Sequence, residues 1–116
     1  GCRTVVTTTP DEHDSIIAYT SQLMHIVAVA LCANPLLERS GSFAGGSLQD
    51  CTRIAVINET MWSELFIENK EHLAERITEF QDCLENIKTA VLNEDREELE
   101  KIMKFATKQK LKWLAK

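Results

Sequence analysis

The sequence contains few residues that interrupt helices and none of the loops that mark a complete catalytic site. Its 116 residues include four glycines and two prolines, and aromatic side chains make up 6% of the chain. No G-x-G-x-x-G, Walker A, H-E-x-x-H or G-x-S-x-G motif occurs. These are the motifs of dinucleotide sites, nucleoside triphosphate sites, zinc proteases and serine hydrolases. We therefore do not expect the chain to be a self-sufficient enzyme.

Long apolar runs are also missing. The longest, Ile26 to Ala33, is far shorter than the roughly 18 residues needed to span a bilayer, and no basic-then-apolar leader begins the chain. The 13 basic and 18 acidic residues leave a formal net charge of -5, which disfavours binding to nucleic acid phosphates. We expect a cytoplasmic protein that binds neither membranes nor nucleic acid.

Cysteine and histidine are too scattered to indicate a disulfide framework or a metal site. No C-x-x-C pair occurs, and the histidines do not fall on one helical face. The residues concerned are Cys2, Cys32, Cys51, Cys83, His13, His25 and His72. We expect free thiols, of which Cys32 and Cys83 act as small hydrophobes, and no bound metal.

Helical periodicity dominates the first half of the chain. Thr9-Pro10-Asp11-Glu12 combines an N-cap, a proline at the first helical position and an acidic capping-box residue. Apolar residues then recur every three or four positions until Asn34-Pro35, which predicts a helix of about 24 residues. The glycine- and serine-rich stretch 40–47 predicts a loop that turns sharply or lies close to another group. A second capping box, Ser47 and Asp50, predicts a short helix over 48–56.

The second half predicts one long helix followed by a charged one. Asn58 is the expected N-cap of a helix of about 34 residues that ends near Leu92, roughly 51 Å long. A compact chain of this size has a radius of gyration of only about 13 Å, so this helix should extend beyond its own domain and pack against a second copy. A fourth helix is expected from about Asn93, with acids early and six lysines from Lys101 onward, forming a solvated face.

Two segments carry residues suited to binding. Ser21 and His25 lie one helical turn apart and could reach one polar pocket, although a histidine bonded within the core is the alternative. Gly45 and Gly46 precede a helix that carries Arg53, and free N–H groups near a guanidinium would suit a carboxylate. An internal ion pair of Arg53 with Asp50 is the alternative interpretation.

These segments belong to a familiar pattern. The succession TPDEHD, SQLMH, FAGGSLQDCTRIA and MWSELFIENK resembles the C-terminal helical domain of prephenate dehydrogenases over about residues 8–92. The resemblance implies an all-α, long-helix domain like the 6-phosphogluconate dehydrogenase C-terminal dimerisation domain. We expect residues 1–116 to form one such domain, and the resemblance implies that a nucleotide-binding domain precedes it in the parent enzyme. The implied reaction is the NAD-dependent oxidative decarboxylation of prephenate to 4-hydroxyphenylpyruvate, in tyrosine biosynthesis.

The resemblance also implies roles for individual residues. Arg53 matches the substrate-binding arginine of the family and His25 matches the second histidine of its S-H-L-P-H motif. The remaining implied substrate-site residues are Ser21, Gly45, Gly46, Asp50 and Trp62. The chain departs from the family motifs at Gln22, Met24 and Ser47, which changes the polar detail of the pocket.

In the family, the catalytic histidine and the NAD-binding glycines belong to the N-terminal domain. We therefore expect a homodimeric fragment, inactive alone, that contributes to a site for prephenate or a tyrosine-like molecule. The initial Gly1 suggests an excised piece.

Two other classes of function remain open from the residues alone. A free-standing helical interaction module would account for the long apolar stripe but not for the glycine loop. An all-helical chorismate mutase would need several cations around a dicarboxylate, whereas only Arg3, Arg39 and Arg53 precede Lys70.

Overall fold

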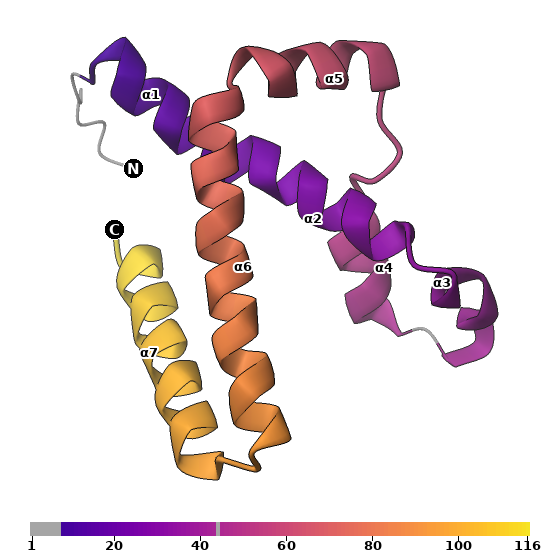
Figure 1. The fold of residues 1–116 in the computed structure, drawn as a ribbon, viewed down its shortest axis with the longest axis vertical. Helices are drawn as coiled ribbons and strands as arrows, with labels where there is room; N and C mark the ends of the chain where they lie inside the picture. Colours follow the sequence, from indigo (N-terminus) through magenta and orange to yellow (C-terminus); the bar gives the residue numbers. More distant parts are fainter. Residues whose placement is uncertain (1–7, 44) are drawn as a thin grey trace. The chain divides into compact units, whose positions relative to one another are not determined.

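The computed structural model describes residues 8–43 and 45–116, and every regular element in this part is a helix. The elements are α1 (Pro10–Ile17), η1 (Ala18–Gln22), α2 (Leu23–Cys32), α3 (Leu36–Arg39), η2 (Gly41–Phe43), α4 (Gly46–Thr52), α5 (Glu59–Glu68), α6 (Lys70–Leu92) and α7 (Arg96–Leu114), as Figure 1 shows. The expected all-α class is confirmed. The chain forms two compact units, Gly1–Ile77 and Thr78–Lys116. Cys2 and Arg3 lie outside the described residues.

The first helical stretch begins as the sequence predicts. Thr9 is the N-cap, its Oγ1 accepts a hydrogen bond from the Glu12 N–H at 3.1 Å, and Pro10 occupies the first turn. The helix continues from α1 through η1 and α2 and ends at Cys32, just before Asn34 and Pro35. Its middle segment, η1, is a π-helix, which the apolar periodicity did not predict.

This stretch, Pro10–Cys32, is the one described helix long and apolar enough to cross a membrane by length and composition, and an 18-residue window within it has a mean hydropathy of 1.6. Core helices of soluble proteins meet the same criterion, so this evidence is weak. The sequence-based expectation of no membrane partner stays a prediction.

The glycine-rich segment folds differently from the expected capping box. α4 begins at Gly46 and ends at Thr52, with Gly45 as its N-cap and no side chain accepting a bond there. The prediction that Ser47 caps a helix over 48–56 is therefore wrong, because Ser47 already lies inside the first turn. The earlier end of the helix makes Arg53 its C-terminal cap.

The predicted single helix from Asn58 to Leu92 is also wrong. Asn58 caps α5 as expected, with its Oδ1 accepting from the Met61 N–H at 2.9 Å. However, Asn69 leaves helical geometry at φ -107° and ψ 26°, and α6 starts anew at Lys70. Figure 1 shows α5 and the start of α6 meeting at a sharp bend. At 23 residues, α6 is about 35 Å long, so the sequence overestimated the continuous length.

Two alanines and two leucines form the buried apolar core among the described residues of the first unit. Ala18 and Ala28 are fully buried, and Leu23 and Leu73 are 3% and 4% exposed. Larger apolar side chains on the same helices stay exposed, among them Ile16, Tyr19, Met24 and Leu31. Apolar surface of this extent marks an interaction face.

The second unit is a helical hairpin made by the distal part of α6 and by α7 (Figure 1). The Asp95 N–H bonds to the Ala90 carbonyl and the Glu94 N–H bonds to the Val91 carbonyl, which is a Schellman motif. Glu94 holds the left-handed position at φ 51°, where glycine is usual. Asp95 then caps α7, so this helix starts at Arg96, slightly later than predicted from Asn93.

Candidate functional site

An aromatic pair joins α2 to α5. The ring centroids of His25 and Trp62 lie 3.9 Å apart with an interplanar angle of 26°, so the two rings stack. Phe66 continues the cluster at 5.7 Å from Trp62. His25 Nδ1 lies 2.9 Å from the Ser21 carbonyl oxygen. Because a carbonyl only accepts, Nδ1 carries the proton and Nε2 is the acceptor of the neutral ring.

Ser21 contacts His25 through its backbone carbonyl and not through its side chain. The expectation was that the Ser21 and His25 side chains share a polar pocket, but the contact of His25 is with the Ser21 carbonyl. His25 and Trp62 are both partly buried, and among the described residues no hydrogen bond of His25 Nε2 is formed. Within the described part of the chain, Nδ1 is thus the ring nitrogen of His25 that has a hydrogen-bond partner.

The glycine segment and Arg53 form a second group on α4, a helix that packs against α2. Gly45, Gly46, Asp50 and Arg53 are all exposed. Arg53 lies at the C-terminal end of α4, so the prediction of a guanidinium beside the helix N-terminus is wrong. Within the described residues Arg53 makes no ion pair with Asp50, and its guanidinium is accessible.

The predicted site residues therefore form two groups. The structure brings His25, Trp62 and the Ser21 carbonyl together, and it places Gly45, Gly46, Asp50 and Arg53 along α4. In the described part of the chain no cluster of three or more potential metal ligands occurs, and Cys32, Cys51 and Cys83 are unpaired thiols. The expected free thiols are confirmed for these three cysteines; Cys32 is partly buried and Cys83 is exposed in this chain.

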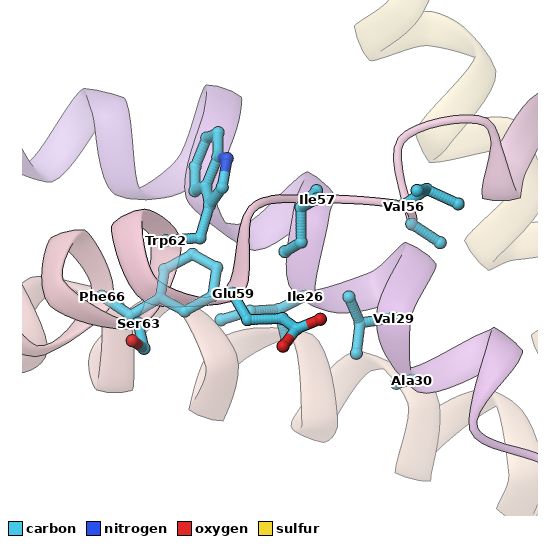
Figure 2. A pocket seen from close by; sticks show the side chains of 10 residues that line it. Ile26, Val29, Ala30, Val56, Ile57, Glu59, Trp62, Ser63 and Phe66 are labelled. Carbon is cyan, nitrogen blue, oxygen red and sulfur yellow. The ribbon is translucent and has the colours of Figure 1, made fainter.

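An open pocket of about 510 Å³ lies between α2, α5 and the segment that precedes α5. Figure 2 shows its lining, which consists of Ile26, Val29, Ala30, Ala55, Val56, Ile57, Glu59, Trp62, Ser63 and Phe66. Among the described lining residues, Trp62 is the only predicted site residue and Glu59 is the only charged one. The carboxylate of Glu59 would repel a dianion. The pocket suits an apolar group better than a dicarboxylate.

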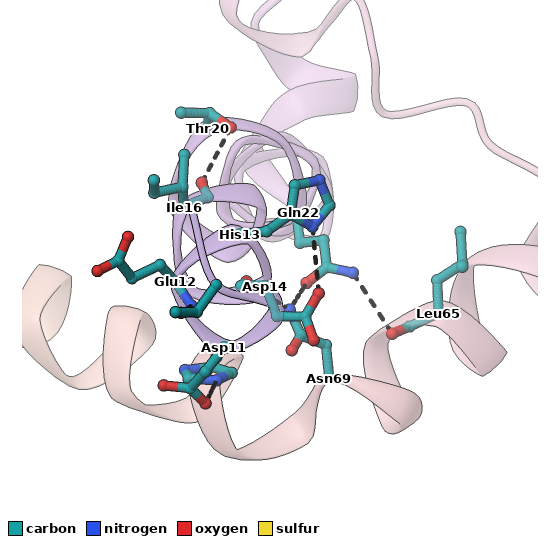
Figure 3. Close-up of polar contacts among 11 residues, drawn as sticks. Asp11, Glu12, His13, Asp14, Ile16, Thr20, Gln22, Leu65 and Asn69 are labelled. Atoms are coloured by element: carbon teal, nitrogen blue, oxygen red, sulfur yellow. Dashed lines mark hydrogen bonds and ion pairs between the residues drawn. The ribbon is translucent and has the colours of Figure 1, made fainter. Parts of the chain in front are cut away.

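The sequence reasoning missed a buried polar contact beside the aromatic pair. Gln22 is 6% exposed, and its side chain reaches Leu65 and Asn69 in Figure 3. The available signal was the pair of polar residues, Gln22 and Asn69, each set within an otherwise apolar helical stripe. A polar residue on such a stripe is usually buried with a hydrogen-bond partner.

The fold and these groups define a class of protein before any comparison is made. A helical domain whose apolar helix faces are exposed is expected to pack against another chain or another domain. The chain belongs to the family described as "Prephenate dehydrogenase, dimerization domain", whose model matches residues 9–105. The resemblance seen in the sequence is thereby confirmed.

Individual relatives agree with this family. The prephenate dehydrogenase of Bacillus subtilis (strain 168) is 34% identical over 105 residues, which cover 84% of this chain and 28% of that protein. The cyclohexadienyl dehydrogenase of Zymomonas mobilis is 26% identical over 111 residues, covering 87% of this chain and 36% of that protein. The chain thus spans about a third of these relatives.

Two solved structures are similar to the chain. The prephenate dehydrogenase from A. aeolicus, in complex with hydroxyphenyl propionate and NAD+, has a TM-score of 0.78 and 30% identity, covering 94% of this chain and 40% of that one. Synechocystis arogenate dehydrogenase has a TM-score of 0.83 at 20% identity, covering 95% of this chain and 42% of that one. The second likeness concerns the fold alone.

Proposed function

We propose that the protein to which this chain belongs is an NAD-dependent prephenate dehydrogenase of tyrosine biosynthesis, located in the cytoplasm. The reaction converts prephenate and NAD+ into 4-hydroxyphenylpyruvate, carbon dioxide and NADH. Family membership over residues 9–105 supports this proposal. The observation that carries it is the His25 ring, which is held on its face by Trp62 and through Nδ1 by the Ser21 carbonyl, leaving Nε2 for a substrate.

The residues of this chain would bind and orient the substrate. Arg53 offers an exposed, planar guanidinium that can grip a carboxylate through two hydrogen bonds. Gly45 and Gly46 offer exposed backbone at the start of α4, where a substrate could approach closely. Asp50 lies about one turn before Arg53 in sequence and would belong to the same substrate site. Together these groups suit the two carboxylates of prephenate or the carboxylate of a tyrosine-like molecule.

NAD would be held elsewhere in the protein. The sequence contains no glycine-rich phosphate loop, and residues 8–43 and 45–116 form no strand from which such a loop could begin. We assign NAD to an N-terminal nucleotide-binding domain of the parent enzyme. When bound, NAD+ accepts the hydride from the substrate ring, while the chain described above binds and orients that ring.

The chain would also form a homodimer. Its family is described as a dimerization domain, and α6 carries an exposed apolar stripe in the second unit. The stripe consists of Phe80, Leu84, Ile87 and Val91, at spacings of four, three and four residues. This alternation is the pattern by which helices of two chains pack along a seam.

Substitution of Arg53 tests the substrate site in the full-length enzyme. We expect Arg53→Ala to lower kcat/KM for prephenate by about 2 to 5 kcal/mol, or roughly 30-fold to several-thousand-fold. The NAD constant and the melting temperature should stay nearly unchanged, because Arg53 is exposed. Arg53→Lys should restore only part of the lost kcat/KM, since an ammonium cannot form the two parallel hydrogen bonds that a guanidinium makes to a carboxylate.

Arg39→Ala is the matched control, because Arg39 is also an exposed arginine at the end of a short helix. It should leave the prephenate KM within about twofold of the wild type, as expected for a surface substitution. A prephenate KM that stays equally constant in Arg53→Ala, together with a melting temperature lowered by several degrees, would show that Arg53 has a structural role.

A further inference from the structure

The bend between α5 and α6 is held by the first helical stretch. Asn69, the residue at the bend, donates through Nδ2 to the Asp14 carbonyl at 2.9 Å and to Gln22 Oε1 at 2.8 Å. The other end of the Gln22 amide, Nε2, donates to the Leu65 carbonyl at 3.4 Å. One buried amide therefore bonds both to the last turn of α5 and to the bend that follows it (Figure 3).

The chemistry of the partners allows only one arrangement of these amides. The Leu65 and Asp14 carbonyls accept and cannot donate, so each must face an amide nitrogen. Gln22 therefore donates through Nε2 to the Leu65 carbonyl and accepts through Oε1. The donor to Oε1 is Nδ2 of Asn69. All three contacts are satisfied at once in a site where Gln22 is 6% exposed. An unsatisfied amide in this place would cost about 1 to 3 kcal/mol.

The π-helical segment places Gln22 on the face that makes these bonds. Asp14 and Gln22 are eight residues apart, which in an unbroken α-helix would put them about 80° apart around the axis at 3.6 residues per turn. The π-turn over Ala18–Gln22 takes up one extra residue, so the pair lies as if seven residues apart, within about 20°. Two further residues of α1, Asp11 and Ser15, lie one turn apart and bond to His72 and Arg76 near the start of α6.

This amide pair adjoins the aromatic pair in sequence: Gln22 ends η1 just before α2, and Asn69 follows the end of α5. Gln22 is three residues before His25, and Leu65 is three residues after Trp62, so each spacing is about one helical turn. Shifting or rotating the end of α5 would therefore displace Trp62 from the His25 ring. We propose that Gln22 and Asn69 are positioning residues that fix the bend after α5 and thereby hold Trp62 on the face of His25.

The consequence for substrate binding rests on the proposed function. The amide pair would set the direction of His25 Nε2 without touching the substrate. Loss of such positioning commonly costs on the order of 10- to 100-fold in kcat/KM, because misplacement by about 1 Å is enough. Gln22 also gives the arrangement a constant hydrogen-bonding state, since an amide does not titrate in the physiological range.

Nuclear magnetic resonance of histidine in the full-length protein tests the positioning role directly. The His25 ring signals are assigned by their loss in His25→Asn, and the ring-current effect of Trp62 is measured as the shift lost in Trp62→Leu. We expect Gln22→Met, which keeps side-chain length but not hydrogen bonding, to abolish at least half of that shift. Asn69→Ser should do the same, as a second variant with a shorter donor. Gln81→Met is the control, because Gln81 is exposed on α6.

Each outcome decides a separate question. If folded Gln22→Met and Asn69→Ser keep the His25 shift within about a tenth of the wild-type value, the positioning role is wrong. If the shift is lost and the prephenate KM rises, both the positioning role and the proposed site stand. If the shift is lost while the prephenate KM and kcat are unchanged, the positioning role stands and the placement of His25 and Trp62 in the substrate site fails.

Discussion

The exposed stripe of α6 gives a prediction whose size follows from the structure. Leu84 is 51% exposed in this chain. Complete burial of a leucine side chain is worth about 1.5 to 3 kcal/mol, so roughly 0.8 to 1.5 kcal/mol remains for a partner surface to gain. A twofold dimer contains the residue twice, which gives about 1.5 to 3 kcal/mol. We expect Leu84→Ala to raise the dimer dissociation constant by about 10- to 150-fold.

The change to alanine leaves the helix itself intact, because alanine has the highest helix propensity. Leu92→Ala is a matched control on the same helix. Leu92 is 73% exposed and lies about 120° from Phe80 around the helix axis, away from the stripe. Sedimentation equilibrium over a dilution series, with helix content followed by circular dichroism, gives the dissociation constants.

Two results would refute this reasoning. Equal dissociation constants for Leu84→Ala and Leu92→Ala would mean that the stripe is not the contact. A wild-type protein that stays monomeric at tens of micromolar, with full helix content, would mean that the exposed face has another partner.

Three further predictions concern the core, a helix end and the cofactor. Leu23→Ala should lower the free energy of unfolding by about 2 to 5 kcal/mol, measured by urea denaturation, because Leu23 is 3% exposed; a loss below about 1 kcal/mol would show that the site collapses around the cavity. Glu94→Gly should raise the melting temperature by roughly 2 to 6 °C, because it removes a left-handed non-glycine residue at φ 51°; an unchanged or lower value would contradict the strain. Calorimetric titration of the 116-residue chain with NAD should give no measurable binding; micromolar affinity would place the cofactor site within these residues.

The helices could be predicted where the signal is local. Thr9 and Asn58 were recognised as N-caps because capping depends on residues within one turn. The break at Asn69 was missed because the apolar stripe continues through it from α5 into α6. What ends α5 is a set of bonds to Asp14 and Gln22, which lie 55 and 47 residues away in the sequence. No local pattern contains that information.

In the candidate site, too, local motifs identify the residues but not their arrangement in space. The residues His25, Trp62 and Arg53 could be chosen from motifs, but their mutual placement could not. The stacking of Trp62 on His25 depends on how α5 crosses α2, and the position of Arg53 depends on α4 ending at Thr52. Ser47 and Asp50 matched a capping box in sequence, yet Gly45 took the N-cap position.

Gly45 and Gly46 can serve as probes of what approaches α4 from outside. A Cβ atom built on either residue would meet nothing within 4 Å, and the Gly45 backbone, at φ -97° and ψ -176°, is extended in a way that any residue adopts. The fold of this chain therefore gives no reason for glycine at these two positions. Alanine there should leave the chain itself undisturbed, so any loss of prephenate affinity in Gly45→Ala or Gly46→Ala would report how closely another molecule lies against this backbone.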